Sequence, residues 1–251
     1  MKKIKISVVS YLNSKPFIYG LNQSEIKNEI DLQLDIPSVC AQKLLDGNVD
    51  IGLIPVAVIP KLKEHYIISD YCIGAVGKVA SVILYSNVPL AEIETVLLDY
   101  QSRTSVTLVK VLAKKFWKIN PQWIPAEADY ENSISGTTAA VIIGDRTFGL
   151  ENKYAYSYDL AEEWQKFTQL PFVFACWVST KKLTQQFISD FNQALKLGLD
   201  NRPLLIKELE ASGKYQTNVD EYLNKSLSYE YDTAKKEALT LFLKYLAKLY
   251  E

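Results

Sequence analysis

Two short stretches of the 251-residue sequence gather side chains that can bind an organic anion. Residues 10–14 read Ser-Tyr-Leu-Asn-Ser, and residues 99–105 read Asp-Tyr-Gln-Ser-Arg-Thr-Ser. Hydroxyl and amide groups donate hydrogen bonds to carboxylate and hydroxyl oxygens and do not titrate near neutral pH. Such groups position a substrate and polarise its oxygens without a metal ion or an imidazole base.

The second stretch follows a predicted strand and begins a predicted helix. Ser102 can cap that helix, which leaves the backbone N–H groups of residues 103–105 and the hydroxyls of Thr104 and Ser105 at its start. A helix N-terminus attracts a carboxylate, with ~0.3–1 kcal/mol coming from the dipole alone. Arg103 either adds a bidentate partner or faces solvent. In the alternative interpretation, these side chains only satisfy the first turn of the helix.

The first stretch ends an alternating strand, in which Ile4, Ile6 and Val8 share one face. Pro16 is typical of the first turn of a helix, so residues 10–14 connect a strand end to a helix start. Ligands of α/β sheets bind at the carboxyl ends of strands. We therefore expect Ser10, Asn13 and Ser14 to lie in a site, although Ser10 and Asn13 can also act only as helix caps.

Three further segments contain candidate residues. Gly144 and Asp145 end a strand with apolar residues on both faces, where glycine lets a ligand approach the backbone and the carboxylate serves the site or caps a turn. Ser81 lies near the start of a long strand and lines a cleft or bonds the backbone. Phe174 is a flat wall for a ring or part of the core.

Composition excludes several kinds of function. The net charge is −1, so a nucleic-acid partner is not expected. His65 is the one histidine and lies in a charged run, and the three cysteines, Cys40, Cys72 and Cys176, are scattered, so we expect no metal, no cofactor and no disulfide framework. The longest apolar stretch, residues 51–59, contains Pro55 and is too short to span a membrane. With no export signal in the first residues, we expect a cytoplasmic protein.

Strand and helix patterns alternate along the chain, which predicts an α/β fold. Strands are expected at residues 4–8, 31–36, 50–55, 67–69, 73–76, 79–86, 95–99, 139–145, 154–158 and 171–178. Helices are expected after Pro16 and at residues 39–45, 106–116, 181–199, 203–211, 219–223 and 233–250.

The alternation falls into two blocks, which predicts two α/β lobes joined by two crossover strands. These strands are residues 79–86 and 172–178. The first lobe is expected to contain residues 1–86 and 176–251, and the second residues 87–175. This is the arrangement of the type II periplasmic-binding-protein fold, in which a ligand lies between the lobes.

The ordered set of motifs resembles the chorismate dehydratases of the futalosine route to menaquinone. The segments are VSYLNSKPF (9–17), GNVDIGLIP (47–55), SVILYS (81–86), LDYQSRTS (98–105), IIGD (142–145) and LPFVFACW (170–177). They occur in order from the N-terminus to Trp177, a span of about two thirds of the chain. Two positions depart from the family pattern: Val56 stands where a serine is expected, and Lys78 where a proline is usual.

The resemblance implies an enzyme that converts chorismate, a dicarboxylate, to 3-[(1-carboxyvinyl)oxy]benzoate and water. Asn13 would hydrogen-bond the substrate near the departing hydroxyl. Hydroxyls of Ser81, Ser102, Thr104 and Ser105 would hold the carboxylates. The proton would go to the side-chain carboxylate of the substrate or to Asp145. The alternatives are a carboxylate-binding or sensing protein of the same fold, and the sister dihydroxynaphthoate synthase, which is expected to rely on a histidine.

Overall fold

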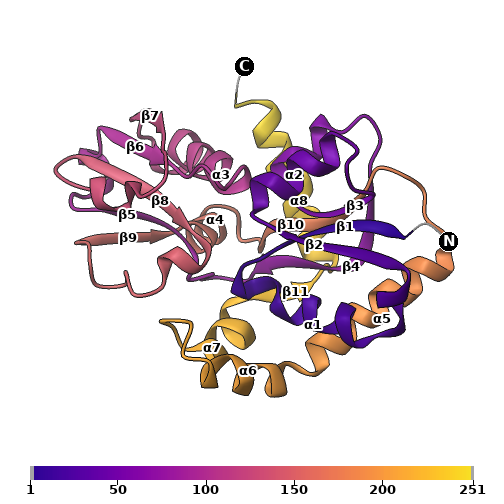
Figure 1. The fold of residues 1–251 in the computed structure, drawn as a ribbon. Coiled ribbons are helices and arrows are strands. Elements are labelled where there is room, and N and C mark those ends of the chain that lie inside the picture. The colour runs from indigo at the N-terminus through magenta and orange to yellow at the C-terminus, as the bar shows by residue number, and fades with distance from the viewer. Residues whose placement is uncertain (1–2, 250–251) are drawn as a thin grey trace.

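The computed structural model describes residues 3–249 and contains two β-sheets, each flanked by helices (Figure 1). The first sheet has the order β11-β4-β10-β3-β1-β2. Its strands are β1 Ile4–Val9, β2 Ile30–Asp35, β3 Ile51–Pro55, β4 Tyr66–Ala75, β10 Phe172–Ser179 and β11 Ser228–Glu230. Strand β1 runs parallel to β2 and β3, whereas β10 is antiparallel to β3 and β4.

The second sheet has the order β7-β6-β8-β5-β9. Its strands are β5 Val82–Ser86, β6 Thr95–Leu98, β7 Gln122–Pro125, β8 Thr138–Ile143 and β9 Tyr156–Asp159. Strand β6 is parallel to β7 and β8, and β5 is antiparallel to β8 and β9. In both sheets the parallel strands carry their carboxyl ends toward the other lobe.

Eight α-helices connect and cover the strands in the described residues. They are α1 Lys15–Gln23, α2 Pro37–Leu45, α3 Thr104–Leu112, α4 Leu160–Thr168, α5 Gln185–Asp200, α6 Arg202–Ala211, α7 Val219–Glu221 and α8 Thr233–Ala247. Short 3-10 segments near the strand ends include η1 Leu12–Ser14, η3 Val56–Lys61 and η7 Gly144–Thr147, and π-helical segments η5 Ala113–Trp117 and η8 Tyr222–Ser226 extend α3 and α7.

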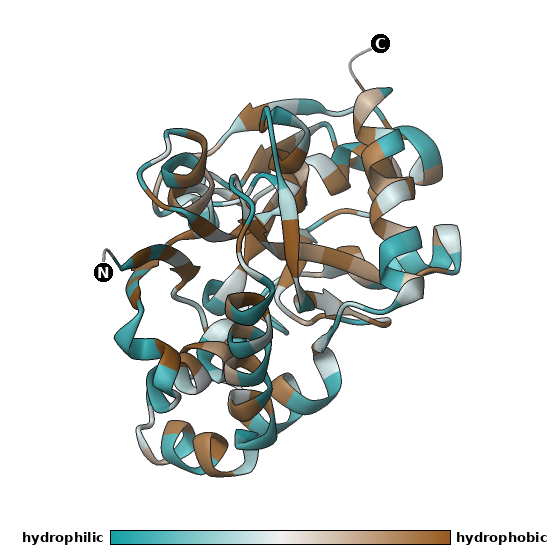
Figure 2. Cartoon of the chain, turned by 90° about the vertical axis from the view of Figure 1, so that its right-hand side faces the viewer, coloured by the Kyte–Doolittle hydropathy of each residue, from teal (hydrophilic) through white to brown (hydrophobic). Residues whose placement is uncertain are grey.

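The apolar patterns explain why the central strands form. All five residues of β3 and all eight residues of β10 are buried. A strand covered on both faces reads as a continuous apolar run, which is the pattern of both segments. Hydrophobic residues, in brown, predominate in the inner strands, whereas hydrophilic residues, in teal, alternate with hydrophobic ones along the helices (Figure 2).

Several predicted elements differ from the observed ones. The segments 67–69 and 73–76 belong to one strand, β4, whose pairing with β10 is irregular between Ile67 and Cys72. That irregularity interrupts the alternation on which the prediction rested. Strands β7 and β11 and helix α4 were not predicted, because the two strands are short and α4 is rich in charged residues.

The predicted crossover strand at 79–86 begins only at Val82. Ala80 has a φ of 61°, in the left-handed region that costs a non-glycine residue ~1–2 kcal/mol, so the chain turns before the strand. The carboxylate of Asp159 holds this turn, since it accepts from the backbone N–H groups of Val79 (3.0 Å) and Ala80 (2.7 Å). It also caps α4 by accepting from Ala161 (3.0 Å).

Sheet membership does not follow the predicted lobe limits at residues 86 and 175. Strand β5 pairs with β8 and β9 in the second sheet, and all of β10 lies in the first sheet. The chain changes sheet in the turn before β5 and in the short connection after α4. We therefore propose lobes formed by residues 3–75 with 172–249 and by residues 82–168.

The core is continuous between the two sheets. One cluster of buried side chains includes Leu84 and Val141 of the second sheet together with Leu53 and Trp177 of the first. Helix α8 packs on the first sheet and contacts both β10 and α3, so it connects the two lobes (Figure 1).

Candidate functional site

A cavity of about 60 Å³ lies between the two lobes, where strand ends from both sheets meet. The first lobe contributes Val9, Tyr11, Asn13, Pro37, Pro55, Ile73, Phe174 and Ala175. The second lobe and the turn before β5 contribute Val79, Ser81, Val82, Ser102, Thr104, Ser105, Ile143 and Gly144. Val9, Pro55 and Ile143 are the last residues of β1, β3 and β8, so the cavity occupies the carboxyl edge of both sheets, where ligands of α/β folds bind.

Most of the predicted site residues line this cavity. They are Asn13, Ser81, Ser102, Thr104, Ser105, Gly144 and Phe174. The opening stretch of the chain and the start of the helix after Asp99 therefore face the same space, although they come from different lobes. The other predicted residues, Ser10, Ser14, Arg103 and Asp145, do not line the cavity.

Asn13 is held in one orientation by its neighbours. The Ser14 hydroxyl, which is buried, donates to Asn13 Oδ1 (2.9 Å), and the Tyr229 hydroxyl donates to the Asn13 carbonyl (3.0 Å). With Oδ1 occupied, the Nδ2 hydrogens of Asn13 are the groups left for other partners. Ser14 thus orients Asn13 without lining the cavity itself. Ser10 is half-buried, and its backbone N–H donates to the Asp35 carbonyl (2.9 Å).

The start of α3 joins the two lobes. Ser102 acts as the predicted cap, because its hydroxyl accepts from the Ser105 N–H (3.0 Å). The Thr104 hydroxyl accepts from the Ala57 N–H (3.3 Å) and donates to the Phe174 carbonyl (3.0 Å). Its hydrogen is therefore bonded to the first lobe and is not available to a ligand. Within residues 3–249 the Ser105 hydroxyl has no hydrogen-bond partner, which leaves it available to a ligand.

Neither the predicted Arg103 nor the second nearby arginine, Arg146, lines the cavity. Arg103 is exposed, whereas the Arg146 guanidinium bonds Asp99 and Glu131 (2.9 Å to the latter) and lies over the Tyr100 ring at 5.3 Å. Burial raises the pKa of Asp99, and the arginine opposes that shift. Arg103 points to solvent because of the direction in which its side chain leaves the start of α3. The presence of a helix start in the sequence does not predict that direction.

Tyr11 lines the cavity and was missed by the sequence analysis. Its ring lies against Gly144, where an added Cβ would be 2.6 Å from the nearest ring atom, and its hydroxyl donates to Gln101 Oε1. Burial is the main cause that raises the pKa of Tyr11, so the phenol stays protonated. Gly144 has a φ of 63°, so both its backbone conformation and the ring packed on it require glycine.

Asp145 contacts the first lobe but faces a different pocket. Its Oδ1 accepts from the Leu12 N–H (3.0 Å), and the residue lines a pocket of about 220 Å³ with Lys214 and Tyr215. Burial raises the pKa of Asp145, opposed by the Leu12 N–H and by Lys15. We call the contacts of Tyr11 and Leu12 with Gln101, Gly144 and Asp145 the interlobe latch.

The size of the cavity indicates a closed arrangement of the lobes. Pockets that bind small molecules usually measure about 300–1,000 Å³, several times the volume found here. Tyr11 and Gly144 of the interlobe latch are part of the cavity lining. A ligand with a six-membered ring is larger than this space, so its entry requires the lobes or the lining side chains to move.

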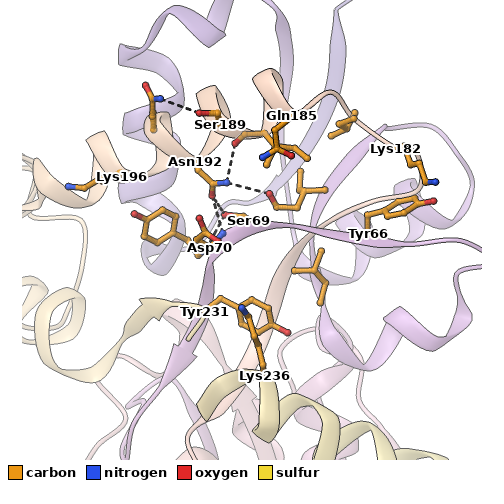
Figure 3. Close-up of a pocket in the computed structure, with 16 residues that line it drawn as sticks. Tyr66, Ser69, Asp70, Lys182, Gln185, Ser189, Asn192, Lys196, Tyr231 and Lys236 are labelled. Atoms are coloured by element: carbon orange, nitrogen blue, oxygen red, sulfur yellow. Dashed lines mark hydrogen bonds between the residues drawn. The ribbon is translucent and has the colours of Figure 1, made fainter. Parts of the chain in front are cut away.

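A larger pocket of about 750 Å³ lies on the outer side of the first lobe, between β4 and α5 (Figure 3). Asn192 occupies its centre, where Oδ1 accepts from the Ser69 hydroxyl (2.8 Å) and from the Asp70 N–H (3.0 Å). These bonds satisfy the irregular part of β4. None of the predicted site residues lines this pocket, so we assign its polar centre to the structure of the sheet.

The cysteines are buried and free, and burial raises the pKa of Cys40 and of Cys72 to about 12. A thiol with such a pKa is a poor nucleophile at neutral pH. Across residues 3–249, no cluster of three or more histidine, cysteine or carboxylate side chains is placed to hold a metal ion. No helix in the same part of the chain is long and apolar enough to cross a membrane.

Comparison with known proteins identifies relatives by sequence. A family model described as menaquinone biosynthesis matches residues 4–248. The chorismate dehydratase of Thermus thermophilus is 28% identical over 160 residues, a match that covers 57% of this chain and 58% of the relative. The chain therefore matches little more than half of that relative's length.

Solved structures with a similar fold cover nearly all of the chain. A protein from Archaeoglobus fulgidus has a TM-score of 0.74 at 12% identity, covering 98% of this chain and 96% of its own. The ligand-binding component of an import system from Staphylococcus aureus has a TM-score of 0.64 at 16% identity, with coverages of 100% and 92%. A Candida albicans protein described as having the generic periplasmic-binding-protein fold has a TM-score of 0.61 at 14% identity, with coverages of 99% and 94%. These TM-scores and coverages show a shared fold, and they confirm the predicted fold class.

Proposed function

Because the chain belongs to the menaquinone-biosynthesis family, we propose that it is a chorismate dehydratase, which removes water from chorismate to give 3-[(1-carboxyvinyl)oxy]benzoate. The observation that carries this proposal is the interlobe cavity, in which amide and hydroxyl groups from both lobes face one space beside an aromatic ring. The named relative supports the same reaction, although it matches the chain over only part of its length.

The chemistry of the cavity suits the proposed substrate. Chorismate has two carboxylates, a hydroxyl and a six-membered ring. Hydroxyls of Ser81 and Ser105 and the start of α3 would hold carboxylate oxygens, and the rings of Phe174 and Tyr11 would flank the substrate ring. Buried donors that meet anionic oxygens form the stronger class of hydrogen bond.

The proposed step breaks one C–H bond at the ring carbon that bears the ether and one C–O bond at the neighbouring carbon. The electrons of the C–H bond form the new ring double bond, and the hydroxyl leaves with a proton as water. Aromatisation drives the reaction, so the enzyme has to supply positioning, water exclusion and a donor for the departing hydroxyl.

The candidate bases are the carboxylate of Asp145 and the side-chain carboxylate of the substrate. Asp145 accepts from the Leu12 N–H and lies outside the cavity lining, so its carboxylate is poorly placed to reach the ring. The side-chain carboxylate of the substrate stays within reach of the ring hydrogen. We therefore favour a substrate carboxylate as the proton acceptor, with Asp145 holding the lobes together.

Asn13 is the proposed donor to the departing hydroxyl, because the Ser14 hydroxyl occupies Oδ1 and leaves Nδ2 as donor. We expect Asn13→Ala to lower kcat about 10²-fold, the range for loss of one donor to a developing charge, with a smaller change in KM. The measurement is loss of the diene absorbance of chorismate and appearance of the aromatic product. Asn28→Ala is the matched control, since Asn28 is exposed and bonds only Glu25 (3.2 Å).

Two outcomes would contradict the proposal. Equal losses in kcat/KM and in affinity for Asn13→Ala would argue against a transition-state role. Binding of chorismate by the wild type without conversion would favour a carboxylate-binding protein of the same fold.

A further inference from the structure

Tyr222, in the C-terminal part of the chain, reaches two residues that line the cavity. Its side chain is buried, with an exposed fraction of 2%, and its ring packs edge-on against Phe148 at 5.2 Å. Its hydroxyl donates to Ser81 Oγ at 2.8 Å, across 141 residues of sequence. Burial raises the pKa of Tyr222, and hydrogen bonds with Ser81 and Asn13 oppose the shift. The phenol therefore stays protonated and keeps its hydrogen for donation.

The direction of this hydrogen bond determines how Ser81 can act. A serine hydroxyl has one hydrogen and two lone pairs. Within residues 3–249, Ser81 Oγ is the one acceptor within reach of the buried Tyr222 hydroxyl, so the tyrosine hydrogen goes to Ser81. One lone pair of Ser81 is then occupied and its own hydrogen is free. Within residues 3–249, no protein acceptor takes that hydrogen, and Ser81 lines the cavity.

Asn13 is constrained by the same tyrosine from the other side. Its Oδ1 accepts from the Ser14 hydroxyl, so its amide hydrogens are what it offers to the Tyr222 oxygen and to the cavity. The tyrosine oxygen accepts one of them while its own hydrogen goes to Ser81. Asn13 is also held by Ser14 and Tyr229, so it keeps its orientation without the tyrosine hydroxyl, whereas the Ser81 side chain has no other protein partner within residues 3–249.

We propose that Tyr222 is a positioning residue that makes Ser81 a hydrogen-bond donor to an anionic oxygen of the ligand. This inference rests on the proposed function, because it specifies which residues of the same site bind a carboxylate of the substrate. Without the tyrosine hydroxyl, Ser81 is free to turn its hydrogen away and to present a lone pair to the anion instead. The C-terminal segment is then part of the binding machinery.

A double-mutant cycle tests the proposal. The variants are Tyr222→Phe, Ser81→Ala and the double variant, and the readouts are KM and kcat for chorismate together with the thermal unfolding midpoint. We expect Tyr222→Phe and Ser81→Ala each to raise KM about tenfold, the loss typical of one hydrogen bond to a charged group, with kcat changed less than twofold. In the Ser81→Ala background, Tyr222→Phe should add no further increase.

Tyr158→Phe is the matched control. Its hydroxyl accepts from the Leu90 N–H (3.2 Å) in the second lobe, away from the cavity, so KM should not change. If Tyr222→Phe does not fold, Ser81→Ala alone still has to show the tenfold rise in KM.

The outcomes separate the two hypotheses. Equal increases in KM on adding Tyr222→Phe to the wild type and to Ser81→Ala would overturn the inference, and so would an unchanged KM in either single variant. A wild type that neither binds nor converts chorismate would refute the proposed function and the inference together. An active wild type with an unaltered Tyr222→Phe variant would overturn the inference alone.

Discussion

Replacing Gly144 with alanine perturbs the interlobe latch at one defined contact. The new Cβ would lie 2.6–2.9 Å from three atoms of the Tyr11 ring, closer than carbon atoms approach without displacement. Gly144 also has a φ of 63°, which an alanine adopts at a cost of ~1–2 kcal/mol. The substitution therefore combines backbone strain with expulsion of a buried ring.

Gly213→Ala separates these two effects. Gly213 has the same φ of 63°, and nothing lies within 4 Å of its added Cβ, so it reports backbone strain alone. We expect Gly213→Ala to lower the free energy of unfolding by ~1–2 kcal/mol. Gly144→Ala should lose that amount and part of the ~1.5–3 kcal/mol that burial of a large side chain provides.

The assay is urea unfolding of both variants, followed by KM for chorismate. Tyr11→Ala, alone and combined with Gly144→Ala, completes the cycle, because removal of the ring should abolish the excess cost of the alanine at 144. Equal losses of stability in Gly144→Ala and Gly213→Ala, with an unchanged KM in both, would refute the assignment of Tyr11 and Gly144 as a closing contact.

Three further predictions concern other parts of the site. Asp145→Asn keeps an oxygen that can accept from Leu12, so it should retain most of the turnover, whereas Asp145→Ala should raise KM; collapse of kcat in Asp145→Asn would instead make the carboxylate the base. Burial raises the pKa of Asp145 above its ordinary 3.8, so the folded chain holds a proton there that the unfolded chain releases. The free energy of unfolding of the wild type relative to Asp145→Asn should therefore be highest below pH 3.8 and fall as the pH rises through the raised pKa. Urea unfolding at a series of pH values measures this difference. Ser102→Ala removes the helix cap and should lower the unfolding free energy by ~1 kcal/mol in the same assay, with no loss contradicting the capping assignment.

Local patterns predicted the parts of the fold that depend on neighbours in sequence. The runs that became β3 and β10 are apolar throughout, and Ser102 caps the helix that follows it. The left-handed turn at Ala80 could not be predicted from local sequence, because alanine is not typical of that conformation. The carboxylate that stabilises the turn comes from Asp159, far away in the sequence.

The site residues show the same division. Asn13 and Ser105 were predicted because strand ends and helix starts are recognisable from sequence, and both line the cavity. Tyr222 was missed because it reaches the cavity from a segment 141 residues away from its partner. Arg103 was predicted to face the site and is exposed, since burial of a side chain depends on packing between segments far apart in the chain.

If the proposed function holds, the interlobe latch has a consequence for the rate of turnover. A product the size of a substituted benzoate is larger than the space of about 60 Å³ between the lobes, so its release requires the lining, which includes Tyr11 and Gly144, to move. Reopening is thus in series with the bond-breaking step, and kcat has an upper limit equal to the reopening rate constant. If reopening sets that limit, raising the solvent viscosity should slow turnover while leaving a single pre-bound conversion unaffected.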